Sequence, residues 1–408
     1  MIKTLERKDL EMKTLYLHIG MPKTATSLIQ TFLAENWNVL QTYGYFFPES
    51  LHTYPGVSGR RNAHFLLGKV KDKDGNRDKE KENSYREEGM QQIRDAFENY
   101  DNVILSDESI WYTLSYFKKS LLRDLKKEAD AQQFQIRVIV YLRRQDTFLI
   151  SRWNQGIKQN SSYASGMTCD EYLEVSPKKE GKIYRYAKKL DEIAAVVGKE
   201  NVIVRRFEPK SWKDGSMIHD FMQAVGLEVT EEFREPEKSV NLRLDKNATE
   251  IKRILNRDEY FTEKEISHMG KFLKEISKDY LGTEETEMLA KEELQQFLNM
   301  YEEENQRVAE EYIKDGKPLF SDEIKDLPKW SAKNDTMQEE TLRFFTEIVM
   351  DLRRTTQMQQ KQIRQQEKKI QSLEKSLLAQ KKDFHTFREK ARHPFRTIWG
   401  RILRQNRT

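Results

Sequence analysis

The chain has 408 residues, of which 37% are hydrophobic and 34% charged, enough for one large α/β domain with an appended segment. Its 71 basic and 67 acidic residues leave a net charge of only +4, which argues against a general nucleic-acid-binding protein with one dominant basic field. The single cysteine, Cys169, excludes a disulfide framework and a cysteine-based metal site.

The N-terminal extension, residues 1–12, lacks the apolar run of a signal peptide. No apolar run of about 18 residues follows it, which is the length that a membrane-spanning helix needs. From these two patterns we expect a cytoplasmic protein.

The stretch Leu15–Gln30 predicts an apolar strand, a tight turn and a helix that begins with hydroxyl residues. Free backbone N–H groups and the positive end of the helix dipole meet at such a helix start, where they can hold a phosphate. Lys23 adds a mobile positive charge, and the neighbouring hydroxyl groups add donors. The alternative is an ordinary strand–helix connection with a solvated lysine. The residues of this predicted anion site are Pro22, Lys23, Thr24, Ala25, Thr26 and Ser27.

Further apolar runs alternate with helical patterns, which predicts a three-layer α/β domain around a central parallel sheet over residues 13–333. Ligands of such sheets bind at the carboxyl ends of the strands. A highly charged stretch, 69–88, interrupts the pattern, and we expect a mobile surface loop there or a lid over a cleft. The predicted strands are Leu15–Ile19, Val103–Ser106, Arg137–Leu142 and Val202–Phe207.

The segment Val138–Ser151 carries a second phosphate-binding pattern. A buried strand ends at Arg143, a helix begins near Gln145, and Ser151 lies in its second turn. The guanidinium and the hydroxyl can therefore converge on one phosphate.

The C-terminal part of the chain predicts a coiled coil over 334–390 and a basic amphipathic tail over 391–408. Apolar or Gln residues recur in a heptad pattern, which favours a homo-oligomer over a lone charged helix. The tail alternates arginines with apolar residues, as in a helix that lies on a membrane surface or docks on a partner subunit. We therefore also expect peripheral contact with the inner face of the membrane.

These motifs resemble those of sulfotransferases that use 3′-phosphoadenosine 5′-phosphosulfate (PAPS), in particular bacterial, carbohydrate-type members. The family has P-K-T/S-G-T-T/S after its first strand, and this chain has residues 22–27 in the same order, with Ala25 in place of the glycine. The family's arginine and its serine eight residues later match Arg143 and Ser151. The segment Val202–Leu227 also resembles the family. If the Ala25 position needs a positive φ, alanine is unfavourable there.

The resemblance implies transfer of a sulfuryl group from PAPS to an acceptor hydroxyl, without a metal. It places the 5′-phosphate on the 22–27 loop and the 3′-phosphate on Arg143 and Ser151, with Arg243 as a further contact. It also implies a glycan acceptor, such as a capsular or lipid-linked saccharide. The alternatives are a small-molecule kinase and a catalytically degenerate scaffold. The Walker motif of a kinase needs glycines before its lysine, and here only Gly20 precedes Lys23.

An acceptor hydroxyl also needs a base that removes its proton. Glu108 follows the second long strand, and carbohydrate-acting relatives often use a glutamate in that segment; it could instead cap or salt-bridge the following helix. Asp107 is its neighbour and an alternative. His64 is a second candidate because histidine titrates near neutrality, although a lone histidine is more often structural. Lys23 would serve the bridging oxygen of the donor. The predicted catalytic residues are therefore Lys23, Glu108 and His64.

Overall fold

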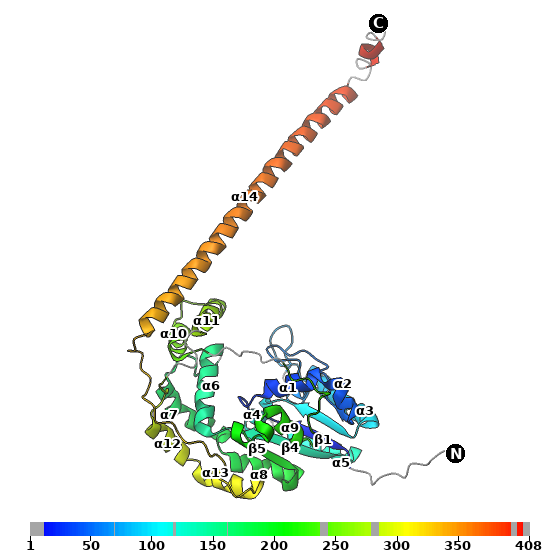
Figure 1. The fold of residues 1–408 in the computed structure, drawn as a ribbon. Coiled ribbons are helices and arrows are strands. Elements are labelled where there is room, and N and C mark those ends of the chain that lie inside the picture. The colour runs from blue at the N-terminus through cyan, green and yellow to red at the C-terminus, as the bar shows by residue number, and fades with distance from the viewer. Residues whose placement is uncertain are drawn as a thin grey trace, which may run out of the picture. The chain divides into compact units, whose positions relative to one another are not determined.

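The computed structural model divides the chain into two compact units, Met1–Asn334 and Asp335–Thr408. Figure 1 gives the order of the elements along the chain. The residues that the structure describes are 12–68, 70–116, 120–160, 162–236, 244–278, 285–392 and 398–402.

The described part of the first unit contains a five-stranded sheet in the order β2-β3-β1-β4-β5. All neighbouring strands are parallel. Apolar residues fill the four longer strands because helices cover both faces of the sheet. The strands are β1 (Thr14–His18), β2 (Tyr45–Phe46), β3 (Asn102–Ser106), β4 (Gln135–Leu142) and β5 (Val202–Arg206).

Two hydrophobic clusters lie on opposite faces of the sheet and make the fold three-layered. Leu17 of β1 packs in the cluster with apolar residues of α3, α5 and α8, whereas Tyr16 packs in the cluster with α1, α2 and α9. This alternation follows from the period of two along a strand. The helices of the two faces are α3 (Lys79–Asn99), α5 (Leu121–Gln132) and α8 (Tyr186–Val197), and α1 (Thr26–Glu35), α2 (Trp37–Thr42) and α9 (Met217–Ala224).

The connections that leave β1 and its two neighbours run to opposite faces. The chain passes from β1 into α1 on one face, and from β3 and β4 into helices whose apolar residues belong to the other cluster. Such a switch of direction opens a crevice outside the carboxyl ends of the strands. Here it occurs on both sides of β1.

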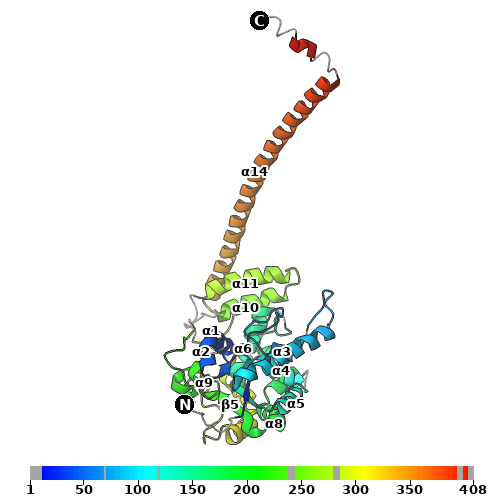
Figure 2. The ribbon, with the colours of Figure 1, turned by 90° about the vertical axis from the view of Figure 1, so that its right-hand side faces the viewer.

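Further helices extend the first unit around this sheet. Figure 2 shows α10 and α11 side by side as a helical pair. The remaining helices of this unit are α4 (Ser109–Tyr116), α6 (Gln145–Gln159), α7 (Cys169–Glu180), α10 (Lys246–Arg257), α11 (Glu263–Ser277), α12 (Lys291–Asn299) and α13 (Glu302–Val308).

The charged stretch 69–88 differs from the loop predicted for it. From Lys79 onward it forms the first turns of α3, which runs to Asn99. The Asp78 side chain caps the helix by accepting a hydrogen bond from the Lys81 N–H at 2.9 Å. Charged residues cover the solvent side here, and the apolar face that holds the helix on the sheet begins only at Met90. The loop thus ends at Asp78.

The second unit consists mainly of one long helix, α14 (Met337–Arg392), of 56 residues. It covers the span predicted to form a coiled coil, while the coiled coil itself stays a prediction. Of the basic tail, residues 398–402 are helical. Among the described residues, no helix is both long and apolar enough to cross a bilayer.

Candidate functional site

The loop after β1 turns through two left-handed residues before α1 begins. Lys23 has φ 69° and Ala25 has φ 55°. Ala25 is the N-cap of α1, and no side chain in the described structure caps this helix end. Thr24 is buried, and its hydroxyl donates to the carbonyl of Met21, which fixes the turn. The first N–H groups of α1 therefore remain available to an anion.

Lys23 lies among other cations. Its Nζ atom donates to Oε1 of Gln155 on α6 at 3.3 Å. Although the residue is exposed, desolvation of the ammonium lowers the pKa of Lys23, and the positive charges of Lys158 and Arg143 lower it further. The positive charges near Lys23 make this a positive site, because each of them raises the cost of charging the Lys23 ammonium. A multiply charged anion would relieve this repulsion.

Arg143 is held against the same loop. Its Nη1 atom donates to the Lys23 carbonyl at 3.0 Å, and its Nε atom donates to Oγ1 of Thr147 at 3.1 Å. The guanidinium also lies over the ring of Phe207, 5.7 Å from its centre. Tyr186 donates its hydroxyl to the Arg143 carbonyl at 2.7 Å and so secures the backbone. These contacts fix the guanidinium at the carboxyl end of β4.

One face of α6 joins these two groups. Thr147, Ser151 and Gln155 are spaced four residues apart and therefore share a face of the helix. Thr147 contacts Arg143 and Gln155 contacts Lys23, so Ser151 lies on the face between the two contacts. The predicted partners Lys23 and Arg143 thus lie together at the carboxyl ends of β1 and β4, with Ser151 on the adjoining face of α6.

Glu108 lies on the other side of the same loop. A Cβ atom added to Gly20, whose φ is +94°, would lie only 3.0 Å from the Glu108 Cβ, so glycine permits this approach. The Glu108 Oε2 atom accepts from Nε2 of Gln30 at 3.1 Å, and its Oε1 atom pairs with Nη1 of Arg61 at 3.4 Å. Glu108 thus lies at the carboxyl ends of β1 and β3, beside the loop that follows β1.

His64 belongs to a cluster around buried Asp107. Its Nδ1 atom lies 2.7 Å from Oδ2 of Asp107, and Arg61 donates to the other carboxylate oxygen. The backbone N–H of Ser109 also donates to Asp107, at 2.8 Å. A carboxylate on Nδ1 orients the imidazole and leaves Nε2 as the ring nitrogen that faces away from Asp107. Arg61 connects this cluster with Glu108.

A buried polar chain runs behind the loop. His18, at the end of β1, contacts the Ser106 hydroxyl through Nδ1 at 2.9 Å, and Gln30 donates to the same hydroxyl at 3.1 Å. Burial lowers the pKa of His18 to about 3, against a smaller opposing effect of Asp107. His18 is therefore neutral, and Gln30 links it through Ser106 to Glu108.

The structure brings most of the predicted site residues together around the end of β1. Pro22 lies in the loop, while Thr26 and Ser27 are in the first turn of α1. Arg243 lies outside the described residues. The prediction missed Arg61, Gln155 and Lys158. Gln155 and Lys158 had a signal, their spacing of four and seven residues from Ser151 on one helix.

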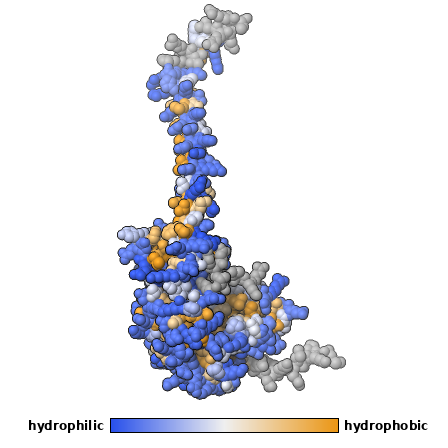
Figure 3. Space-filling model, turned by 60° about the vertical axis from the view of Figure 1, so that its left-hand side comes forward, coloured by the Kyte–Doolittle hydropathy of each residue, from blue (hydrophilic) through white to orange (hydrophobic). Residues whose placement is uncertain are grey.

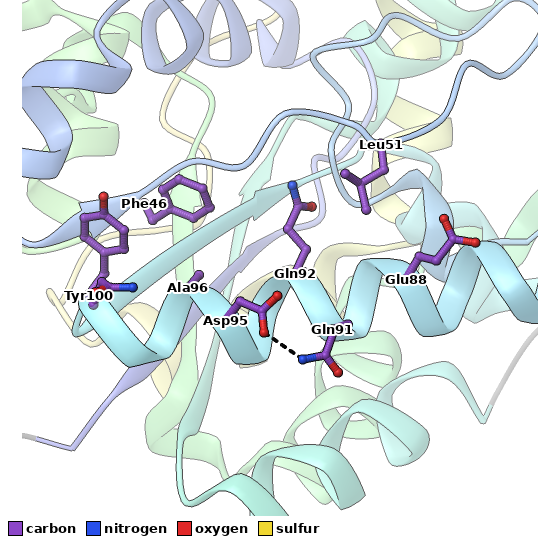
Figure 4. Close-up of a pocket in the computed structure, with 9 residues that line it drawn as sticks. Phe46, Leu51, Glu88, Gln91, Gln92, Asp95, Ala96 and Tyr100 are labelled. Atoms are coloured by element: carbon purple, nitrogen blue, oxygen red, sulfur yellow. Dashed lines mark hydrogen bonds between the residues drawn. The ribbon is translucent and has the colours of Figure 1, made fainter.

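A separate groove of about 510 Å³ runs along α3 (Figure 4). Phe46, Leu51 and Tyr100 line it together with polar residues of the helix, and none of the predicted site residues borders it. Among the described residues, no cluster of histidine, cysteine or acidic side chains is arranged to hold a metal ion.

No protein-family model matches the chain. An uncharacterised protein of Archaeoglobus fulgidus is 26% identical over 177 residues, which are 43% of this chain and 46% of that protein. The match thus spans less than half of the relative's length. Among solved structures, a sulfotransferase from Alicyclobacillus acidocaldarius is similar with a TM-score of 0.33 and 16% identity, over 59% of this chain and 92% of that one. Neither likeness assigns an activity to this chain.

Proposed function

We propose that the protein transfers a sulfuryl group from PAPS to an acceptor hydroxyl, and that the acceptor is a glycan. The observation that carries this proposal is the hydrogen bond from Arg143 to the Lys23 carbonyl. It joins two predicted anion-binding motifs, far apart in the sequence, at the carboxyl edge of the sheet. A nucleotide with phosphate groups at both its 5′ and 3′ positions offers negative charge to both motifs.

The residues present fit such a donor. The N–H groups at the start of α1 and the Lys23 ammonium would hold the 5′ end, since these groups have no carboxylate partner among the contacts found in the described structure. Arg143 and Ser151 would hold the 3′-phosphate, the guanidinium with a two-pronged donor and the serine with a hydroxyl.

The reaction is an in-line displacement at sulfur. The acceptor oxygen forms a bond to sulfur, the bond from sulfur to the phosphate oxygen breaks, and the electron pair of that bond remains on the phosphate. The nucleotide leaves as adenosine 3′,5′-bisphosphate. Lys23 would neutralise the charge that develops on the leaving oxygen, which is the stabilisation that this type of transfer needs most.

The proton of the acceptor hydroxyl passes to a protein base. Glu108 lies beside Gly20 and hence next to the loop, with its side chain 19% exposed. His64 is held by Asp107 in the arrangement that suits a general base, and Arg61 lies between the two candidates. We assign the base to Glu108 because it approaches the loop directly. A glutamate as base also supports a glycan acceptor, because the carbohydrate-acting sulfotransferases that the sequence resembles often use a glutamate in this segment.

Calorimetry with adenosine 3′,5′-bisphosphate in the presence of a chelator tests donor binding. We expect binding without magnesium, and a thermal shift in the same buffer. Binding of only ATP with magnesium would identify a kinase instead, and binding of neither nucleotide would refute both enzyme assignments. Incubation with radiolabelled PAPS and fractionated cell-envelope glycans then tests the acceptor, and label confined to non-glycan fractions would exclude the glycan.

A further inference from the structure

Helix α14 carries a stripe of exposed apolar side chains that polar residues interrupt at a few positions. Figure 3 shows apolar residues recurring along this helix between polar ones. They follow a seven-residue period with two positions in each repeat, and each is between 53% and 69% exposed. A helix with such a stripe gains stability when a second surface covers it. We call these positions the seam, and its apolar members are Leu342, Phe345, Val349, Leu352, Ile363, Ile370, Leu373, Leu377, Phe384 and Phe387.

The choice of residues within the seam favours a coiled coil of two helices. The first position of the repeat is β-branched at four consecutive heptads, and leucine occupies the second position at Leu352 and Leu373. β-Branched residues at the first position with leucine at the second favour parallel two-stranded coiled coils. The four β-branched positions are Val349, Thr356, Ile363 and Ile370.

The glutamines of the seam favour the parallel orientation of the two helices. In a parallel pair in register, Gln359, Gln366 and Gln380 each face their own copy, and two amides can hydrogen-bond to each other. In an antiparallel pair with the seam ends matched, Gln359 faces Ile370 and Gln366 faces Ile363. That arrangement buries amides against apolar side chains, which is unfavourable.

The charges beside the seam favour the same arrangement. In a parallel pair, each residue before the first seam position lies near the residue five positions later in the second copy. Lys369 then meets Glu374 of the second copy, and Asp383 meets Arg388 of the second copy. The remaining pairs of this kind carry at most one charge: Thr341 with Thr346, Ile348 with Arg353, Thr355 with Gln360, Gln362 with Glu367, and Ser376 with Lys381.

We infer that α14 binds α14 of a second copy of this chain as a parallel, in-register, two-stranded coiled coil. The seams of the two copies cover each other. The glutamine pairs and the flanking charge pairs match only when both helices are parallel and in register. This pairing also brings the C-terminal ends of both α14 helices to one end of the coil.

Two neighbouring leucines provide a matched test of the seam. Leu377 lies in the seam and is 53% exposed, whereas Leu378 lies outside it and is 65% exposed. Sedimentation equilibrium of the full chain should give twice the mass of one chain. Leu377→Asp should weaken the dimer by about 100-fold or more, because it buries a charge in the seam, while Leu378→Asp should leave it unchanged. A monomeric wild-type chain, or equal effects of both variants, would overturn the inference.

Disulfide trapping tests orientation and register. Gln380→Cys places thiols opposite each other only in the parallel, in-register pair, whereas Ser372→Cys lies on the outer face in any pairing through the seam. The natural Cys169 is buried, so the wild-type chain serves as the background. Under mild oxidation we expect covalent dimers from Gln380→Cys alone. A wild-type dimer whose Gln380→Cys variant does not cross-link would contradict the parallel register.

Discussion

The Nη1 atom of Arg143 donates a hydrogen bond to the carbonyl of Lys23 at 3.0 Å, across 120 residues of sequence. This contact ties the carboxyl end of β4 to the loop that follows β1. The side chain of Lys23 meanwhile reaches Gln155 on α6, so the loop, the strand and the helix hold one another. An anion bound here would contact three elements of the fold at once.

Replacement of Arg143 by alanine should weaken the binding of adenosine 3′,5′-bisphosphate by about 1.5–3 kcal/mol, the range for a hydrogen bond to a charged group. The guanidinium supplies the donors for the 3′-phosphate in the proposed complex. Calorimetry measures the loss, and adenosine 5′-phosphate should be much less affected because it lacks the 3′ group.

Arg205 on β5 is the matched control for this variant. It lies on the next strand and pairs with Asp220 at 3.7 Å. Arg205→Ala should bind the nucleotide as the wild type does. Equal losses in both variants would mean that Arg143 acts only through the general charge of the protein.

Replacement of Ala25 by glycine should stabilise the protein. Alanine at φ 55° adopts a left-handed conformation that costs about 1–2 kcal/mol, and glycine removes most of this strain at the expense of a more flexible unfolded chain. We expect a net gain of about 0.5–1 kcal/mol in urea unfolding. Ala34→Gly, in the helical part of α1, should instead lose about as much; a loss at Ala25 as well would show that its conformation is not strained.

The sequence predicted the sheet well because four strands are continuous apolar runs, and their observed ends lie within two residues of the predicted ones. It missed β2, whose two residues, Tyr45 and Phe46, are too few to show a period. The start of α3 was missed because its charged solvent face has the composition of a loop.

The convergence of Lys23 and Arg143 could be predicted because adjacent parallel strands end at the same edge of a sheet. Arg61 could not, since it lies in a segment without periodic pattern, and its contacts with Asp107 and Glu108 exist only in three dimensions. Gln155 could have been found from its place on the Ser151 face of α6.

The affinity for the nucleotide should fall as the pH rises through the pKa of Lys23. That pKa is lower than the value of an ordinary lysine, because of desolvation first and of Lys158 and Arg143 next. Bound phosphate would favour the charged form, so binding at alkaline pH should take up a proton. Calorimetry in buffers of different ionisation enthalpy measures this uptake. Lys23→Arg, which stays charged, should lose it; an unchanged uptake would assign the proton to another group.

Buried His18 should make the protein less stable in acid. Its pKa is about 3 in the folded protein and 6.5 in the unfolded chain. Between these values the unfolded chain binds one more proton, so the free energy of unfolding decreases as the pH falls below 6.5. The slope approaches about 1.4 kcal/mol for each pH unit.

Urea unfolding at a series of pH values measures this slope. His18→Asn keeps an amide near the Ser106 hydroxyl but removes the titrating ring, and it should flatten the slope whatever its effect on stability at neutral pH. His268→Asn, at an exposed position on α11, should leave the slope as it is. If His18→Asn retains the full slope, the acid sensitivity has another origin.

Replacement of Glu108 by glutamine should reduce turnover by about 10²–10⁴-fold, because it removes the base that accepts the acceptor's proton. Gln30 can still hydrogen-bond to the new amide, so nucleotide affinity should change little. His64→Gln is the parallel variant: it keeps a polar group near Asp107 and should retain most of the activity. Initial rates with saturating PAPS, measured together with nucleotide affinity, separate the two. Full activity in Glu108→Gln combined with a large loss in His64→Gln would transfer the role of base to His64, and Arg61 would then act by fixing the shared carboxylate of Asp107.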